Sequence, residues 1–285
     1  MTAAIAHALP LATRESRLTR VLLITLTVVL LVAMLVLPLA VVFTEALSHG
    51  LAAVGDALAE PEAITSIELT LLVAAVSVPL NTVCGLAAAW CIGRFQFPGR
   101  SLLITLIELP VSVSPVISGL VWVLLFGANG WFGPLLDRMG VRIIFAVPGL
   151  ILATVLVSFP FVARSLIPLM QQQGAAEEEA AITLGAGFWQ MAWRVTLPNI
   201  RWGLLYGVLL CNARAMGEFG AVAVVSGHIR GQTMTMPLQV EALFNDYDWV
   251  GAFTIAGLLS LLALVTLAVK AALEWRIGEH SGALL

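Results

Sequence analysis

The stretch EEEAAITLGAGFWQMAWRVTLP, Glu177–Pro198, separates two long apolar runs, and the rest of the chain is organised around it. Residues that favour helices fill 175–184, two glycines interrupt them, and 188–197 can form a second short helix. The three glutamates fall in the first turn, where carboxylates favour the positive end of the helix dipole. Trp189 and Trp193 are four residues apart and share one face of the second helix. The stretch is predicted to be a helix–turn–helix that either docks into a partner's groove or lies on lipid headgroups.

The composition around this stretch is that of a membrane protein. The chain has 285 residues, of which 60% are hydrophobic and only 11% are charged, whereas soluble domains carry about 25% charged residues. The formal net charge of -3 is small and gives no reason to expect a nucleic-acid partner. The three cysteines lie inside apolar runs, so we expect buried packing residues rather than disulfides.

The motifs of several enzyme classes are missing. Lys270 is the only lysine and no glycine-rich loop precedes it, so the chain cannot form the phosphate-binding loop of an ATPase. The motifs G-x-S-x-G and H-E-x-x-H of hydrolases are also absent. We therefore expect no catalytic residue, no metal and no cofactor in this chain, and any ATP must be bound by another polypeptide.

Six apolar runs are long enough to cross a bilayer, which takes roughly 20 helical residues. They predict an all-α, polytopic membrane protein without a separate soluble domain. The first run is too long for a cleaved signal sequence and indicates an anchor that follows an N-terminal tail, residues 1–20. The predicted spans are Val21–Phe43, Ile67–Ile92, Leu102–Phe126, Ile144–Met170, Trp202–Ser226 and Val250–Leu273.

The distribution of arginine and lysine predicts the orientation, because these residues favour the cytoplasmic side. With the N-terminus inside, one side and its span ends hold Arg14, Arg17, Arg20, Arg94, Arg100, Arg164, Arg194, Arg201, Lys270 and Arg276. The other side holds Arg138, Arg142 and Arg230. We therefore expect a multi-pass protein of the cell (inner) membrane whose termini, including the tail 274–285, and whose 177–198 stretch are cytoplasmic.

The third span is not a plain helix in sequence. Its segment ELPVSVSPVISG, Glu108–Gly119, carries two prolines and three serines at membrane depth. Proline removes a backbone hydrogen bond and kinks a helix, so such a segment faces protein or a water-filled path. Ser112, Ser114 and Pro115 are therefore candidates for a translocation path or gate, the alternative being a kinked helix buried against its neighbours.

Two opposite charges lie inside the fifth span. Arg214 and Glu218 are four residues apart and share one helix face, and neither is expected to face lipid. They form either part of an anion path or a neutralised pair that locks helices together. Gly217 and Gly220 flank the glutamate and would permit close approach of another helix.

The 177–198 stretch resembles the cytoplasmic E-A-A loop of permease subunits in ATP-binding cassette (ABC) importers. The family pattern is Glu-Ala-Ala, three residues, Gly, nine residues and Ile-x-Leu-Pro, and only Val195 departs from it. The resemblance implies a type I importer permease domain, residues 66–273, whose loop 174–200 forms a coupling helix in a cleft of the ATPase. The residues that it assigns to this coupling are Glu178, Glu179, Ala180, Ala181, Gly185, Trp189, Leu197 and Pro198.

Three further stretches are similar to the W-type permease subunits of sulfate/thiosulfate importers. They are SPVISGLVW (114–122), FGANGWFG (126–133) and SGHIRGQTMTMPLQVEALFNDYD (226–248). The resemblance implies import of sulfate or thiosulfate with a homologous second permease, two ATPase subunits and a periplasmic sulfate-binding protein. His228, Arg230 and Gln232 in the outer loop are then candidates to contact that binding protein, although by composition the loop is equally a solvated connector.

Two other functions remain open. A molybdate or tungstate permease would share the membrane frame and the coupling loop. A secondary anion transporter would work without ATP and is expected to contain inverted repeats, which the two halves of this sequence do not show.

Overall fold

The computed structural model describes the backbone of residues 17–282 and the side chains of residues 18–272. Every regular element in these ranges is a helix, which confirms the predicted all-α class. Most of the predicted N-terminal tail, including Arg14, lies outside the described residues, as do residues 283–285 of the predicted C-terminal tail.

The described residues contain helices that are long and apolar enough for six membrane spans, if each bent pair of helices is counted as one span. Four spans lie in the long helices α1 (Arg17–Ala46), α3 (Pro61–Arg94), α7 (Val147–Gln173) and α13 (Trp249–Gly282). The third span consists of α4 (Arg100–Ser112) and α5 (Pro115–Phe126), and it is bent by 106° between them. The fifth consists of a helix over 188–216 followed by α11 (Gly220–Ser226), bent by 50°.

The break in the third span follows from Pro115. Val113 and Ser114 are both extended, with ψ angles of 140° and 132°. A residue before proline is driven out of the helical region by a clash with the proline ring. The expected irregularity of this span is confirmed, and it takes the form of a sharp corner.

The prediction for the fifth span was wrong at its start. We expected a short helix to end at Leu197 and a separate span to begin at Trp202. Instead α9 (Phe188–Met191) continues through a π-helical turn, Ala192–Thr196, into α10 (Leu197–Met216). Pro198 then lies in the first turn of α10, where a missing N–H is tolerated, and the wider π turn shifts the hydrogen-bond register ahead of it.

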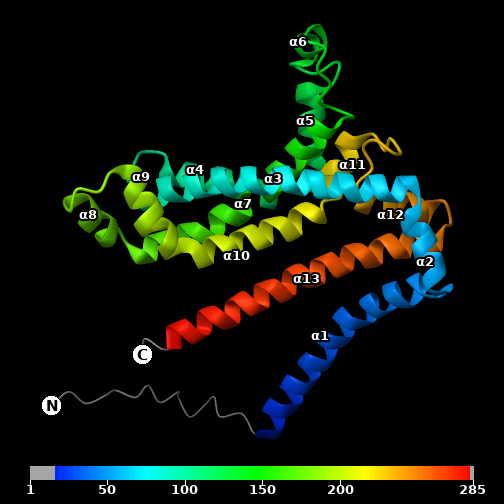
Figure 1. Cartoon of the computed structure of the whole chain (residues 1–285), viewed down its shortest axis with the longest axis horizontal. Coiled ribbons are helices and arrows are strands. Elements are labelled where there is room, and N and C mark those ends of the chain that lie inside the picture. Colours follow the sequence, from blue (N-terminus) through cyan, green and yellow to red (C-terminus); the bar gives the residue numbers. More distant parts are fainter. Residues whose placement is uncertain (1–16, 283–285) are drawn as a thin grey trace.

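The long helices α3, α7 and α10 form the centre of the molecule and run side by side (Figure 1). Glycines allow this packing, because a Cβ atom at Gly85 would lie 2.8 Å from Cβ of Val162. Helix α1 packs against α13 and otherwise exposes its apolar side chains. Cys211 is buried as expected, whereas Cys84 is exposed on α3, where the prediction of burial was wrong.

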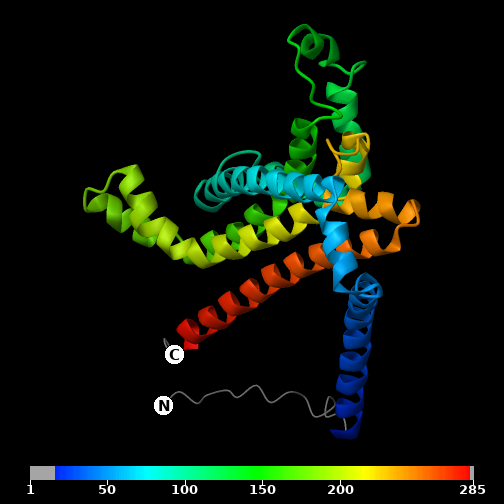
Figure 2. The same ribbon diagram turned by 45° about the vertical axis from the view of Figure 1, so that its right-hand side comes forward.

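Shorter helices lie at the two ends and on one side of this frame. The hairpin of α8 (Ala176–Thr183) and α9 lies at one end, and α2 (Gly50–Ala59) and α12 (Met236–Asn245) lie at the opposite end in both views (Figures 1 and 2). Helix α5 rises away from the frame and carries α6 (Gly133–Arg138) at its tip (Figure 1).

Candidate coupling and transport site

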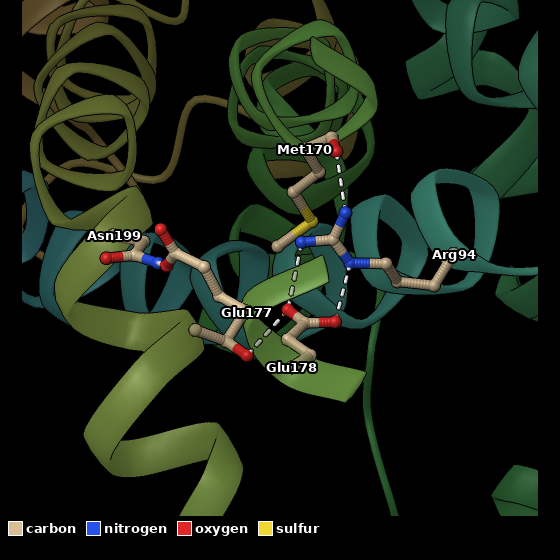
Figure 3. A network of polar contacts seen from close by, with 6 residues as sticks. Arg94, Met170, Glu177, Glu178 and Asn199 are labelled. Carbon is tan, nitrogen blue, oxygen red and sulfur yellow. Dashed lines mark hydrogen bonds and ion pairs between the residues drawn. The ribbon is translucent and has the colours of Figure 1, made fainter. Parts of the chain in front are cut away.

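A buried ion pair fastens the α8–α9 hairpin to the membrane helices. The carboxylate of Glu178 lies 2.8 Å from Nε of Arg94 and accepts a hydrogen bond of 2.9 Å from Nη2 of the same guanidinium (Figure 3). Nη1 of Arg94 donates to the carbonyl oxygen of Met170 at 2.7 Å. The ends of α3 and α7 and the start of α8 are therefore joined by one guanidinium, and a two-point contact of this kind fixes the angle between the groups it joins.

Two more contacts join the hairpin to the start of α10. The hydroxyl of Thr196 donates to Glu178 Oε1 at 2.7 Å. Asn199 donates to the carboxylate of Glu177, and both residues are labelled in Figure 3. Gln173 donates to the carbonyl oxygen of Asn199 at 3.1 Å. None of Arg94, Thr196 and Asn199 was predicted as a site residue from the sequence.

Most of the other predicted coupling residues are exposed. Glu179, Ala180 and Gly185 are exposed, Ala181 and Leu197 are half-buried, and Pro198 is exposed. Gly185 makes the turn with a φ of 90°, which favours glycine and confirms the predicted break. The apolar side chains here are unusually open: Leu184 is 89%, Trp189 72% and Trp193 65% exposed. A patch of this kind marks a surface that another molecule covers.

The charged pair of the fifth span is confirmed. Arg214 Nη1 lies 2.7 Å from Glu218 Oε2, and Glu218 Oε1 accepts a hydrogen bond of 2.9 Å from the backbone N–H of Ala221. Glu218 is buried, with 1% of its side chain exposed, whereas 31% of Arg214 is exposed. Glu218 therefore holds together the two segments of the broken span, and its arginine partner stays partly exposed.

The two broken spans meet where each of them bends. A Cβ atom at Gly220 would lie 3.1 Å from Cβ of Pro115, and one at Gly119 would lie 2.6 Å from the carbonyl oxygen of Ala221. The expectation of close approach is confirmed at Gly220. It was wrong at Gly217, where a Cβ atom would meet only the helix's own Ala213 carbonyl, at 3.6 Å, because this glycine lies in the bend itself.

The other path candidates on the third span, Ser112 and Ser114, are exposed. Both flank the corner between α4 and α5, so the sequence placed them on the correct structural feature.

The outer-loop candidates form a charged cluster with α12 and the start of α3. Arg230 pairs with Asp246 and lies 3.7 Å from Glu62, while His228 Nε2 lies 3.5 Å from Glu241. The hydrogen bond to Asp246 raises the pKa of the Arg230 guanidinium. Gln232 lies apart from these pairs, beside a hollow of about 690 Å³ between the loop and the α5–α6 arm.

No metal centre is evident in the described part of the chain. Among those residues no three His, Cys, Asp or Glu side chains come close enough to hold an ion.

Comparison with known proteins identifies the family. The model of the family described as "Binding-protein-dependent transport system inner membrane component" matches residues 81–278. The chain is 53% identical over 243 residues to the sulfate transport system permease protein CysW of Escherichia coli K12, covering 85% of this chain and 84% of the relative. It is 33% identical over 246 residues to CysT of the same organism, covering 86% and 89%.

A solved structure shares the fold. It is a bacterial alginate ABC transporter in complex with an alginate pentasaccharide-bound periplasmic protein, with a TM-score of 0.74, 19% identity and coverage of 91% of this chain and 94% of that one. Since the family model covers more than half of the chain and both relatives span most of its length, the chain belongs to the binding-protein-dependent transport system inner membrane components, the permease subunits of ABC importers.

Proposed function

We propose that this chain is one of two homologous permease subunits of an ATP-driven sulfate and thiosulfate importer in the cell inner membrane. The observation that carries the proposal is the 53% identity to a sulfate permease along most of both chains. The 33% identity to CysT, a second sulfate permease, supports a homologous partner subunit.

The α8–α9 hairpin is proposed to couple this subunit to an ATPase. Glu178 is held inside the chain by Arg94, so Glu179 is the carboxylate left to meet a basic group on the ATPase. Trp189 and the neighbouring exposed apolar side chains would fill an apolar pocket there. On this proposal the hairpin and both termini lie in the cytoplasm, where two ATPase subunits would bind ATP.

The contact between the two broken spans is proposed as the gate of the path. Pro115 and Gly220 touch at the bends, and Arg214 and Glu218 lie next to this contact. A relative movement of α4 and α10 would open or close the contact between α5 and α11. At the outer end, the cluster around Arg230 and His228, with Gln232 at the neighbouring hollow, is the proposed docking face for a periplasmic sulfate-binding protein.

The test is uptake of radiolabelled sulfate by cells with and without this chain, with thiosulfate and molybdate as competitors. We expect uptake to require the chain and to be inhibited by thiosulfate more than by molybdate. Uptake that is blocked best by molybdate would contradict the substrate. Uptake that persists without an ATPase subunit would contradict the coupling and favour secondary transport.

A further inference from the structure

A second pair of charges lies at membrane depth, away from the Arg214–Glu218 pair. Arg164 on α7 lies 3.9 Å from Glu108 on α4, and about half of each side chain is exposed (54% and 53%). Glu108 is eight residues from the start of α4, and Arg164 is nine residues from the end of α7. At 1.5 Å per residue both lie about 12–14 Å from the helix ends that flank the coupling hairpin.

The surroundings of Glu108 show a polar face on α4. Ser101, Thr105, Glu108 and Ser112 follow one another at spacings of four, three and four, which puts them on one side of the helix, and all four are exposed. The neighbouring side is apolar and also exposed, with Leu102, Leu106 and Leu109. Ile107 and Pro110 on the third side are buried.

The charged pair, rather than the hydroxyl groups, indicates whether the polar face of α4 contacts lipid or water. Thr105 and Ser112 donate to carbonyl oxygens of their own helix, so their hydroxyls alone would be tolerated in lipid. A half-exposed arginine and glutamate would not be tolerated in lipid, because charged side chains in the bilayer face protein or water. The apolar face of α4 suits lipid, and the polar face suits a water-filled path.

From this geometry, and resting on the proposed function, we infer that Arg164 and the polar face of α4 form a transit site for a tetrahedral oxyanion on the coupling-hairpin side of the gate. The planar guanidinium can donate two parallel hydrogen bonds to such an anion. Glu108 neutralises Arg164 when no anion is present and competes with the anion for it. A separation of 3.9 Å, against 2.8 Å for Arg94 and Glu178, makes Glu108 a partner that can be exchanged. Conduction requires such weak binding, because an anion that binds tightly does not leave.

The first test is the accessibility of single cysteines in the assembled complex in inside-out vesicles. The three native cysteines are replaced by alanine, and Thr105→Cys is compared with Leu106→Cys at the same depth on the apolar face. A membrane-impermeant, charged methanethiosulfonate should label Thr105→Cys at least tenfold faster, and sulfate should slow that labelling. Equal labelling of both positions, or cross-linking of Thr105→Cys to the second permease without labelling, would overturn the transit site.

The second test separates an anion site from a structural pair. Arg164→Gln should reduce the sulfate uptake rate on the order of tenfold, the loss expected from one charge-assisted contact, with the amount of complex unchanged. Glu108→Gln should retain uptake, and the double variant should remain as defective as Arg164→Gln. If the double variant recovers uptake, the pair is structural and the inference fails. If molybdate but not sulfate protects Thr105→Cys, the transit site stands and the proposed substrate fails.

Discussion

Arg94 and Glu178 are 84 residues apart in the sequence, yet their side chains meet in a buried position, with one hydrogen bond of 2.9 Å and an ion-pair contact of 2.8 Å between Nε and Oε2. Because Arg94 also binds the carbonyl oxygen of Met170, the hairpin is attached through this arginine to α3 and to the end of α7, the helix that precedes it. A force applied to the hairpin is therefore transmitted directly to two membrane helices. This connection also distinguishes two adjacent glutamates: Glu178 is paired inside the chain, whereas Glu179 is exposed.

Breaking this buried pair on one side should be costly. Arg94→Met leaves the Glu178 carboxylate buried and uncompensated, and we expect a loss of about 3–5 kcal/mol in the free energy of unfolding. The double variant Arg94→Met/Glu178→Met should lose less than Arg94→Met alone, because no charge is then left unpaired. Both losses are measured by thermal unfolding of the purified protein, with tryptophan fluorescence as the signal. A double variant that loses as much as Arg94→Met or more would contradict this account of the pair.

Glu179→Lys should uncouple transport without removing the protein from the membrane. Glu179 is exposed on α8 and has the charge to meet a basic group of the ATPase, so reversing it replaces attraction by repulsion. Glu45→Lys is the matched control, because it makes the same charge change at an exposed position near the C-terminal end of α1. We expect sulfate uptake and ATPase copurification to be lost in Glu179→Lys only. Normal uptake in that variant would contradict the role of Glu179.

Trp189→Ala should weaken binding of the ATPase subunit by about 2 kcal/mol or more, which is roughly a thirtyfold increase in Kd. Buried tryptophans contribute most at the centre of an interface, and Trp189 is 72% exposed in the isolated chain. Trp131→Ala removes a tryptophan that is 85% exposed near α6, away from the hairpin, and should leave this Kd unchanged. Equal effects of the two substitutions would place the interface elsewhere.

The number of spans was predictable because it depends on long apolar runs, which need no knowledge of tertiary contacts. The corner in the third span was also predictable, since Pro115 acts on the residues next to it. The continuation of α9 into α10 was not. Pro198 reads as the end of a helix, and the π turn that accommodates it depends on a change of hydrogen-bond register that no single residue indicates.

The candidate site also contains contacts that the sequence predicts and contacts that it does not. Arg214 and Glu218 are four residues apart on one helix, so their pairing follows from helix geometry alone. The pairs Arg94–Glu178 and Glu108–Arg164 join different helices, and the sequence contains no signal for how those helices are placed. The E-A-A spacing singles out Glu179 in the sequence, but nothing there indicates that Glu178 is buried, because its burial arises only once the hairpin has folded back on α3.

Arg214→Ala distinguishes the two roles of the fifth-span pair. Loss of the arginine leaves the buried carboxylate of Glu218 without its partner, so we expect less assembled complex. Arg214→Ala/Glu218→Gln removes the unpaired charge and keeps an oxygen to accept the Ala221 N–H, so the amount of complex should recover. Sulfate uptake by the recovered complex then decides the role. Absent uptake assigns Arg214 to the path, and normal uptake assigns the pair to structure alone.

The contact between α5 and α11 is tested by one methyl group. In Gly119→Ala the new Cβ would lie 2.6 Å from the carbonyl oxygen of Ala221 and 3.0 Å from Cβ of Val224, so the two helices must move apart. We expect a destabilisation of about 1–3 kcal/mol, the usual cost of overpacking, together with a leak or loss of sulfate transport. Gly55→Ala is the control, because that helical glycine has nothing within 4 Å of its added Cβ and alanine should stabilise α2 by about 0.5–1 kcal/mol. Thermal unfolding and uptake measured side by side separate these effects. If Gly119→Ala were as harmless as Gly55→Ala, the close contact between the two broken spans would not be needed, and the gate would have to lie elsewhere.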